Sequence, residues 1–403
     1  MTPPLDVGYR LLAAQYIHKQ ARQLAEQFDG ARRADDVEFV HRARVASRRL
    51  RAAFRMFADC FKAKRLKRWR KHIRRVTTGL GEARDKDVQI EWLGKTLASL
   101  EDKACCDGVA RLLVRLEQQR ERLQPKVTEA ADRLQASGVL GEMQAAAKRI
   151  LAEAKAGEST MQSPAAFRQI ERHILNHLGQ LLSYQDSLAR PEDKQRHHAM
   201  RIAAKRLRYT MEISGPVYVG AVSDAISVAK KLQNLLGEVH DCDVWDEHLR
   251  DFAARQRKRI VKYFGHPEPF ARLEVGIEHL RNERRQRRRQ VFHELGEYWQ
   301  DLSRREYWGV LVAAVKSRGR TALEPAAASD PAAETAGSQN SGDGGPDVDG
   351  GPNGDGAGEC TEREDVVGQD LARRSDGGAN RASEPRQPKA ATAQAVREKA
   401  ISQ

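Results

Sequence analysis

The chain has 403 residues, with 70 Lys and Arg against 56 Asp and Glu and a formal net charge of +14. Its five cysteines form no CxxC pair, which excludes a disulfide scaffold and a zinc-finger framework and favours a reducing cytoplasm. No stretch stays apolar over the ~18 residues that a transmembrane helix needs, so no membrane partner is expected.

Charge divides the chain into two regions. From Thr321 to the end there are 8 basic and 15 acidic residues, whereas the first 320 residues hold 62 basic and 41 acidic ones, a net of +21. The region from Thr321 also holds 12 of the 30 glycines and 6 of the 14 prolines. Because such a segment buries too little apolar surface to offset its ordering entropy, residues 319–403 are predicted to be a disordered tail. We favour a solvating spacer over an acidic segment that competes for the basic region.

The region before the tail is predicted to be all-α, because apolar residues recur at three- and four-residue spacing without alternating runs. The predicted helices cover roughly 8–29, 36–59, 64–103, 106–155, 163–188, 192–214, 220–259 and 267–315. Breaks are expected near Asp29-Gly30, Ser163-Pro164, Arg190-Pro191, Gly215-Pro216 and His266-Pro267. Pro164 and Pro191 suit a first helical turn. Helices of this length predict antiparallel bundles.

An internal repeat organises these helices. The segment HRARVASRRLR at 41–51 returns as HAMRIAAKRLR at 198–208, at an offset of 157. The segment LGEARDKDV at 80–88 returns as LGEVHDCDV at 236–244, at an offset of 156. Two elements in the same order at nearly one offset predict a duplication, with two pseudo-symmetric bundles at 1–158 and 159–318.

The first element places cations along one helix face. At about 100° per residue, a stripe roughly 80° wide holds His41, Arg44, Arg48, Arg51 and Arg55. In the second copy the stripe holds His198, Arg201, Lys205 and Arg208, with Glu212 in the place of Arg55. Like charges at this spacing repel by a few tenths of a kcal/mol per pair, so an anionic ligand is expected to compensate them.

The second element adds basic groups on a neighbouring helix. These are Lys71, Arg74 and Arg75 in the first half, and Lys230 and Lys231 in the second. Basic groups on two adjacent helices would form one groove facing a chain of phosphates. Guanidinium groups suit that target, since they chelate phosphate oxygens bidentately and stay charged.

These two duplicated motifs resemble the CHAD family, the helical domain named for its conserved histidines, over roughly Gly8 to Ser317. The resemblance implies two helical bundles related by pseudo-symmetry, and a basic central cavity that binds inorganic polyphosphate. It also implies a cytoplasmic protein that associates with polyphosphate granules. Carried over by position, it points to His41, Arg44, Arg48, Arg51, Arg74 and Arg75, and to His198, Arg201, Lys205, Arg208, Lys230 and Lys231. Related chains often carry a triphosphate-tunnel domain, whose Glu-x-Glu-x-Lys signature is absent here.

Metal binding and catalysis are the first alternatives. Asp85 with Asp87, and Asp241 with Asp243, could hold Mg²⁺, but we favour carboxylates that pair with arginines and position them. The two stripe histidines offer no HxxxH or HExxH pair, so we favour a phosphate-facing role over metal binding or helix packing. No GxSxG or GxxxxGK motif occurs, and the two copies disagree at the His240-Asp241 dyad, where the first has Arg84. We therefore expect neither enzymatic activity nor a cofactor, and we keep a metal-assisted polyphosphate-processing enzyme as the alternative.

Nucleic-acid binding is the second alternative, since a net +21 also suits that ligand. The five tryptophans fall at apolar helical positions and are predicted to be core rather than stacking platforms: Trp69, Trp92, Trp245, Trp299 and Trp308. The densest cation run, Arg281 to Arg289, could extend the groove, bind nucleic acid, or be a solvated helix face with interleaved Glu.

Overall fold

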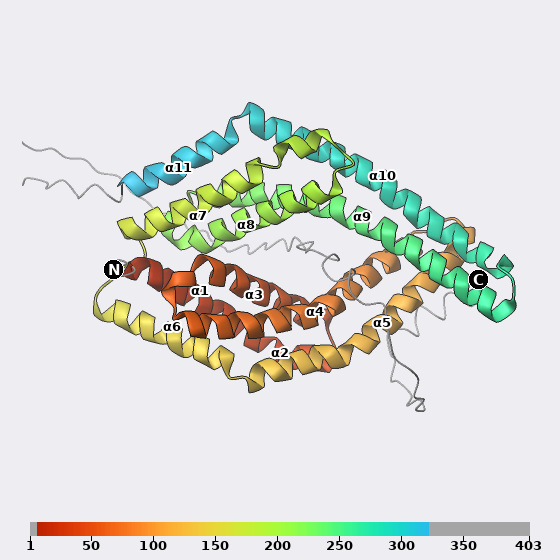
Figure 1. Ribbon diagram of the computed structural model, residues 1–403, viewed down its shortest axis with the longest axis horizontal. Helices are drawn as coiled ribbons and strands as arrows, with labels where there is room; N and C mark the ends of the chain where they lie inside the picture. The colour runs from red at the N-terminus through yellow and green to blue at the C-terminus, as the bar shows by residue number, and fades with distance from the viewer. Residues whose placement is uncertain (1–5, 322–403) are drawn as a thin grey trace, which may run out of the picture. The chain divides into compact units, whose positions relative to one another are not determined.

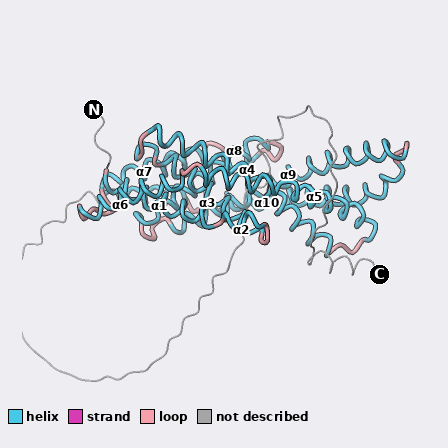
Figure 2. The backbone as a smooth tube through the Cα atoms, turned by 90° about the horizontal axis from the view of Figure 1, so that it is seen from below, coloured by secondary structure: helices cyan, strands magenta, loops and turns pink. Residues whose placement is uncertain are grey.

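The computed structural model describes residues 6–321, and side chains for residues 6–317. All regular structure in this part is helical, and no strand occurs in it (Figure 2). The all-α prediction is therefore confirmed. The predicted tail lies outside the described residues, apart from residues 319–321, which end the last helix.

Eleven α-helices make up the described part. They are α1 (Val7–Glu26), α2 (Phe28–Arg33), α3 (Val37–Met56), α4 (Ala63–Ala98), α5 (Lys103–Ala136), α6 (Val139–Ala156), α7 (Pro164–Leu182), α8 (Lys194–Tyr218), α9 (Ser223–Phe264), α10 (Glu268–Arg304) and α11 (Tyr307–Thr321). Two short 3₁₀ helices cover Ala58–Cys60 and Gln185–Ala189.

Two of the predicted helices are each divided in two. The helix predicted over 106–155 breaks between α5 and α6, where Gly138 adopts the left-handed conformation with φ of 66°. Glycine is suited to this position because it has no Cβ. The helix predicted over 267–315 breaks between α10 and α11, where Glu306 has φ of 48°. Neither break contains a proline to mark it, so the apolar periodicity predicted one continuous helix at each place.

The predicted break at Gly215-Pro216 is wrong. Helix α8 continues through Pro216 to Tyr218, and the buried side chains of Val217 and Tyr218 hold its last turn in the core. The helix ends only at Val219 and Gly220, which have φ of 30° and 80°. Burial of two large side chains outweighs the hydrogen bond that a proline removes.

The predicted break at Asp29-Gly30 is displaced. Helix α1 ends at Glu26, and Gly30 lies inside the short helix α2. A Cβ on Gly30 would lie 2.2 Å from the Phe39 ring, so this glycine marks close packing rather than a chain break.

The two prolines expected in first helical turns differ. Pro164 is the first residue of α7, and the Ser163 hydroxyl caps this helix by accepting from the Ala166 N–H at 3.1 Å. Pro191 precedes α8, which begins at Lys194 after an Asp193 cap. Only the first placement is confirmed.

The helices pack in a similar order in the two predicted halves (Figure 1). Helix α3 lies against α1 and α4, while α8 lies against α7 and α9. Helix α5 packs on α4, and α10 packs on α9; α6 covers α1, and α11 covers α7. The first and later helices meet where α3 contacts α8 and where α5 contacts α10. The symmetry of a duplication and its 158/159 boundary remain predictions.

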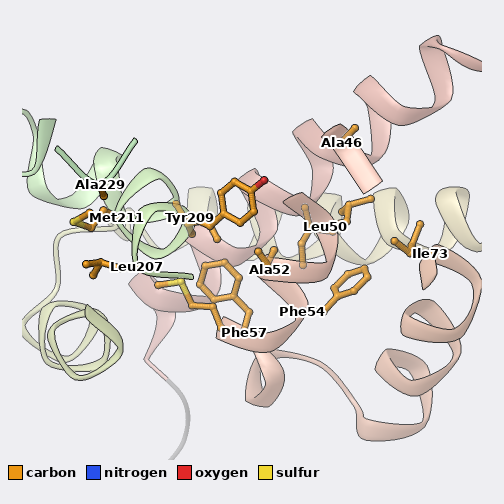
Figure 3. Packing of buried hydrophobic residues seen from close by; sticks show 14 of the residues in the cluster. Ala46, Leu50, Ala52, Phe54, Phe57, Ile73, Leu207, Tyr209, Met211 and Ala229 are labelled. Carbon is orange, nitrogen blue, oxygen red and sulfur yellow. The ribbon is translucent and has the colours of Figure 1, made fainter. Parts of the chain in front are cut away.

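Two main apolar cores hold the helices together. The larger includes Leu50, Trp69 and Leu207, and Figure 3 shows Leu50 and Leu207 within it. A separate core joins the far ends of α4, α5, α9 and α10 through Leu93, Val109, Leu112, Leu116, Trp245, Leu249, Phe252, Phe270, Ile277 and Leu280. Four of the five tryptophans are buried and Trp92 is half-buried, which confirms their prediction as core residues.

Helices α5 and α10 cross at two glycines. A Cβ on Gly108 would lie 2.2 Å from the Leu273 carbonyl oxygen, and a Cβ on Gly276 would lie 2.1 Å from that of Cys105. The two backbones approach this closely only because both residues lack side chains.

Candidate functional site

The repeated cationic elements lie on four helices that pack together. The first element occupies α3 and α8, which contact each other, and the second occupies α4 and α9. Leu50 and Leu207, on the opposite faces of α3 and α8, are fully buried. Burial of these apolar faces fixes the rotation of each helix, and hence the direction of its cations.

Four arginines of α3 and α4 come together at the first stripe. Burial, and then the positive charges of Arg74, Arg48 and Arg44, lower the pKa of Arg51. Like charges disfavour ionisation only at short range, so α3 and α4 hold these guanidinium groups close to one another. Arg51 is half-buried and Arg74 is exposed, which leaves part of the group open to solvent.

Arg201 of α8 extends this group across the contact between α3 and α8. Its side chain is 5% exposed, and burial lowers its pKa to about 10. Asp241 raises the pKa of Arg201, while the positive charge of Arg48 lowers it. The two stripes therefore meet at Arg48 and Arg201. We call Arg44, Arg48, Arg51, Arg74 and Arg201 the cation cluster.

A histidine pair adjoins Arg201. The rings of His198 and His240 lie 4.4 Å apart between centroids, and Arg201 Nη2 lies 3.5 Å from His198 Nδ1. Burial and the Arg201 charge lower the pKa of His198 and favour its neutral form. The sequence singled out His240 only as a dyad candidate, because Arg84 occupies the matching position in the first copy. The signal in the sequence that could have placed His240 at the site is its position next to Asp241 in the second repeated element. The first stripe histidine, His41, is half-buried on α3.

The paired aspartates of the second element hold arginines. The ion pairs join Asp85 to Arg44 at 3.4 Å, Asp87 to Arg120 at 2.5 Å and Asp243 to Arg288 at 2.7 Å. These contacts confirm the prediction that such carboxylates position arginines. Within residues 6–317, no group of three or more His, Cys, Asp or Glu is placed to hold a metal ion.

The arginine run of α10 also has internal partners. Arg281 and Arg285 contact Asp246 at 3.3 and 2.9 Å, Arg287 contacts Glu238 at 2.7 Å, and Arg288 contacts Asp243. Arg284 stacks on the Trp92 ring at 4.3 Å and pairs with Glu283. The carboxylates come mainly from α9, so this run ties α10 to α9.

Several residues predicted to line the groove contact side chains outside the cation cluster instead. Arg208 is 2% exposed, 3.5 Å from Glu212 and 5.0 Å from the Tyr209 ring centroid. Lys231 lies 4.3 Å from the Tyr298 ring centroid and so points toward α10. Its neighbour Lys230 is half-buried and points about 100° away around α9.

The remaining predicted cations surround the cluster or extend from it. Lys205 is half-buried beside Tyr209, at 6.0 Å from its ring centroid. Lys71 and Arg75 are exposed on α4. The pKa of the neighbouring His72 is lowered mainly by burial, and further by the positive charges of Arg68 and Arg75. Arg55 lines a small pocket of about 70 Å³ with Arg206.

A larger hollow of about 520 Å³ lies between the start of α4 and α6. It is lined by Lys62, Lys64, Arg65, Arg68, Glu142, Ala145, Ala146 and Arg149. None of the predicted groove residues is among them, so this hollow and the cation cluster are separate features of the described part.

No helix within the described residues is both long and apolar enough to cross a membrane.

Two curated relatives from Mycobacterium tuberculosis, "Uncharacterized protein MT2285" and "Uncharacterized protein Rv2226", are each 26% identical over 240 residues, which is 59% of this chain and 45% of theirs. The chain thus spans about half the length of these relatives. Their names state no ligand or activity.

Two solved structures are also similar. The CHAD domain from the plant Ricinus communis is 19% identical, with a TM-score of 0.47, covering 78% of this chain and 92% of that one. PptA from Streptomyces chartreusis is 15% identical, with a TM-score of 0.44, covering 72% of this chain and 98% of that one. The family model described as the CHAD domain matches residues 15–250, more than half of the chain and both copies of each repeated element. The protein belongs to the CHAD domain family.

Proposed function

We propose that the protein binds inorganic polyphosphate at the cation cluster, and that it does so without catalysing a reaction on the chain. The observation that carries this proposal is the crowding at Arg51, whose pKa is lowered by burial and then by three neighbouring arginines. A bound polyanion would replace that repulsion with charge-assisted hydrogen bonds. Members of the CHAD family are associated with polyphosphate, which supports this choice of anion.

The enclosure of the cluster favours a slender chain over a duplex. Arg48 and Arg201 are 8% and 5% exposed, so only a small part of either side chain is accessible to a ligand as wide as a duplex. A bare phosphate chain has no bases or sugars to exclude. Binding to single-stranded nucleic acid usually adds stacking on aromatic side chains, and four of the five tryptophans here are buried.

The carboxylates nearest the cluster support a binding role. Asp85 holds Arg44, and Asp87 holds Arg120, so both act by positioning cations. The enzyme alternative requires Asp85, or Asp241 in the second copy, to serve the reacting phosphate. It is tested by measuring orthophosphate release from polyphosphate with and without Mg²⁺; sustained release with either would replace the binding proposal.

The first experiment measures binding of long-chain polyphosphate to the full chain over a series of salt concentrations. Duplex DNA and RNA, at equal phosphate concentration, serve as competitors. We expect polyphosphate to win clearly, and its affinity to fall steeply with salt because cations on the protein release counterions from the ligand. Equal competition by nucleic acid would mean that the basic surface binds any polyanion.

The matched variants locate the binding. The double variant Arg51→Gln and Arg74→Gln should lose at least ten-fold in affinity, and its salt slope should fall by about one to two. The control, Arg257→Gln with Lys258→Gln, removes two exposed cations near the far end of α9 and should bind as the parent does. If the two double variants bind alike, the cluster is not the site.

In the cell, the proposal implies that the protein associates with polyphosphate granules in the cytoplasm. A fluorescent fusion of the full chain should co-localise with stained granules. The Arg51 and Arg74 double variant should be diffuse while the control remains on the granules. Equal co-localisation of both variants would mean that another surface directs the protein there.

A further inference from the structure

The small pocket that contains Arg55 has a composition unlike that of the cation cluster. It lies between α3, α7 and α8 and has a volume of about 70 Å³. Its lining residues are Ala52, Arg55, Met56, His173, His177, Arg206, Tyr209, Thr210 and Ile213, with no carboxylate among them. Figure 3 shows two of them, Ala52 and Tyr209, beside each other where α3 meets α8. We call this the histidine pocket.

Its size suits one small ion. A buried water needs only about 10–15 Å³ on the same measure, so the pocket has room for several waters or one tetrahedral oxyanion. Its two arginines lie near each other: desolvation, and then the charges of Arg51 and Arg206, lower the pKa of Arg55. Arg206 is exposed, so it marks the open side.

Hydrogen bonds fix the protonation of the His173 ring. The Tyr9 hydroxyl donates its only hydrogen to the Met56 carbonyl at 2.8 Å. The same oxygen lies 3.1 Å from His173 Nε2, so Nε2 must donate to it. In the neutral ring, Nδ1 therefore carries a lone pair.

Hydrogen bonds also fix the protonation of the His177 ring, but here the donor nitrogen is Nδ1. The Thr210 hydroxyl donates to the Arg206 carbonyl at 2.9 Å, so His177 Nδ1, at 2.9 Å, donates to Thr210 Oγ1. Its Nε2 is then the acceptor. Burial, and then His173, Arg206 and Arg55, lower the pKa of His177 to about 4, which keeps the ring neutral at pH 7.

The repeat offers an internal comparison. At the offset of 157, the buried positions Ala13, Ile17, Ala21 and Leu24 of α1 match Ile170, Ile174, Leu178 and Leu181 of α7. The same offset matches the four pocket residues His173, His177, Arg206 and Arg55 with Tyr16, Gln20, Arg49 and Glu212.

This matching set is electrically balanced. Arg49 lowers and Glu212 raises the pKa of Tyr16, which is raised mainly by burial, so both charges lie close to its hydroxyl. Glu212 also lies 3.5 Å from Arg208. The matching set thus contains a carboxylate, that of Glu212 on α8, whereas the histidine pocket has a second arginine, Arg55 of α3, at the equivalent position and two imidazoles in place of Tyr16 and Gln20. An external anion would complete it.

We propose that the histidine pocket binds a protonated tetrahedral oxyanion, namely hydrogenphosphate. Arg55 and Arg206 donate to its charged oxygens, and one of the two acceptor nitrogens, Nδ1 of His173 or Nε2 of His177, accepts its single P–OH hydrogen. Sulfate has the same shape and the same charge of −2 near pH 7.5 but carries no hydrogen, so it leaves these acceptors without a donor and should bind more weakly. The source of the group is free orthophosphate or the end group of a phosphate chain. The inference does not depend on polyphosphate binding at the cation cluster.

Calorimetry on the full chain at pH 7.5 tests the selectivity. Orthophosphate should bind at one site, and sulfate at least ten-fold more weakly. Arg206→Gln should lose at least ten-fold in phosphate affinity, whereas Arg42→Gln, which removes an exposed arginine of α3, should bind as the parent does. Equal binding of the two anions to the parent, or parental phosphate affinity in Arg206→Gln, would overturn the proposal.

Two further variants use the internal comparison. Arg55→Glu installs the residue type of the matching position, and it should abolish phosphate binding because the introduced carboxylate would pair with Arg206. His177→Gln installs the residue type found at position 20, whose amide can donate as well as accept. It should bring the phosphate-to-sulfate ratio down toward one, a change that a purely structural histidine would not cause. An unchanged ratio in a folded His177→Gln protein would remove the histidine from the site.

The source of the anion is separated by competition. If chain ends occupy the pocket, ordinary polyphosphate should displace orthophosphate, and chains with blocked ends should not. If neither displaces it, the pocket takes free orthophosphate. The Arg51→Gln and Arg74→Gln double variant should retain orthophosphate binding, so failure of the cation cluster and failure of the histidine pocket give different results.

Discussion

The Arg44 guanidinium occupies the space next to Gly81, where a Cβ would lie 2.7 Å from Arg44 Nη1. Gly81 belongs to the repeated Leu-Gly-Glu element, and Arg44 belongs to the stripe on the adjacent helix. The glycine thus lets the arginine pass close to the α4 backbone, where it also reaches Asp85 at 3.4 Å. In the second copy, a Cβ on Gly237 would meet no atom within 4 Å.

This difference makes Gly81→Ala and Gly237→Ala a matched pair. The first should displace the flexible end of Arg44 and weaken polyphosphate binding several-fold, with little loss of stability because Ala favours helix by about 1 kcal/mol. The second should bind as the parent does. Affinity measured at fixed salt, together with thermal unfolding, checks both. Equal affinity in the two variants would show that the position of Arg44 does not matter for binding.

The crossing of α5 and α10 predicts a large effect on stability. Gly108→Ala and Gly276→Ala each force a methyl group against a backbone carbonyl, and each should lower the free energy of unfolding by about 1–3 kcal/mol or more. The double variant should cost less than the sum, because one separation of the helices relieves both clashes. Gly296→Ala on α10 faces open space and should be neutral or slightly stabilising in the same urea denaturation series.

Two half-buried histidines predict a loss of stability in acid. Burial, with nearby cations, lowers the pKa of His177 and of His248 to about 4 from 6.5. Between these values the unfolded chain binds protons that the folded chain does not, so the stabilisation is complete above pH 6.5 and is lost as pH falls toward 4. Each histidine should contribute about 1–3 kcal/mol to this loss.

Urea denaturation in phosphate-free buffer from pH 7.5 to 4.5 measures this slope. His177→Gln and His248→Gln should each flatten it, whereas His293→Gln, at an exposed position of α10, should leave it unchanged. A parental slope in both buried-site variants would assign the acid sensitivity to other groups.

The contacts of the α10 arginines predict that replacing one of them lowers the stability of the fold without weakening polyphosphate binding. Arg288 Nε lies 2.7 Å from Asp243 and its Nη2 donates to the Pro191 carbonyl at 2.8 Å, so it joins α10 to α9 and to the segment before α8. Arg288→Gln should lower the free energy of unfolding by about 1–3 kcal/mol. Its polyphosphate affinity should stay within two-fold of the parent. A large loss of affinity with unchanged stability would place this run in the binding surface.

The sequence predicted the features that depend on helical periodicity. Apolar spacing identified the helical regions and the buried faces opposite each stripe, and the stripe itself identified Arg44, Arg48 and Arg51 as neighbours. Charge repulsion along one helix is a local property, so it can be read without knowing the partners of that helix.

The partners across helices could not be read in the same way. The Arg208–Glu212 pair lies within α8 at a spacing of four residues, but the burial of Arg208 depends on the helices packed against α8, which include α1 and α3. From the sequence, the arginine run of α10 could extend the groove, bind nucleic acid or be a solvated face, and only the structure shows the α9 carboxylates that pair with it. Whether a cation faces a ligand or a carboxylate depends on which helix lies opposite, and periodicity does not determine that.

The contact of Gly108 with Gly276 is reciprocal: a Cβ on either glycine would clash with the backbone of the helix that carries the other. A contact in which residue i meets j while j meets i is the rule at the interface of a symmetric homodimer. Here the two helices belong to one chain and are joined through the connection between α6 and α7. The crossing therefore forms at any protein concentration, whereas the same contact between two subunits would be lost on dilution.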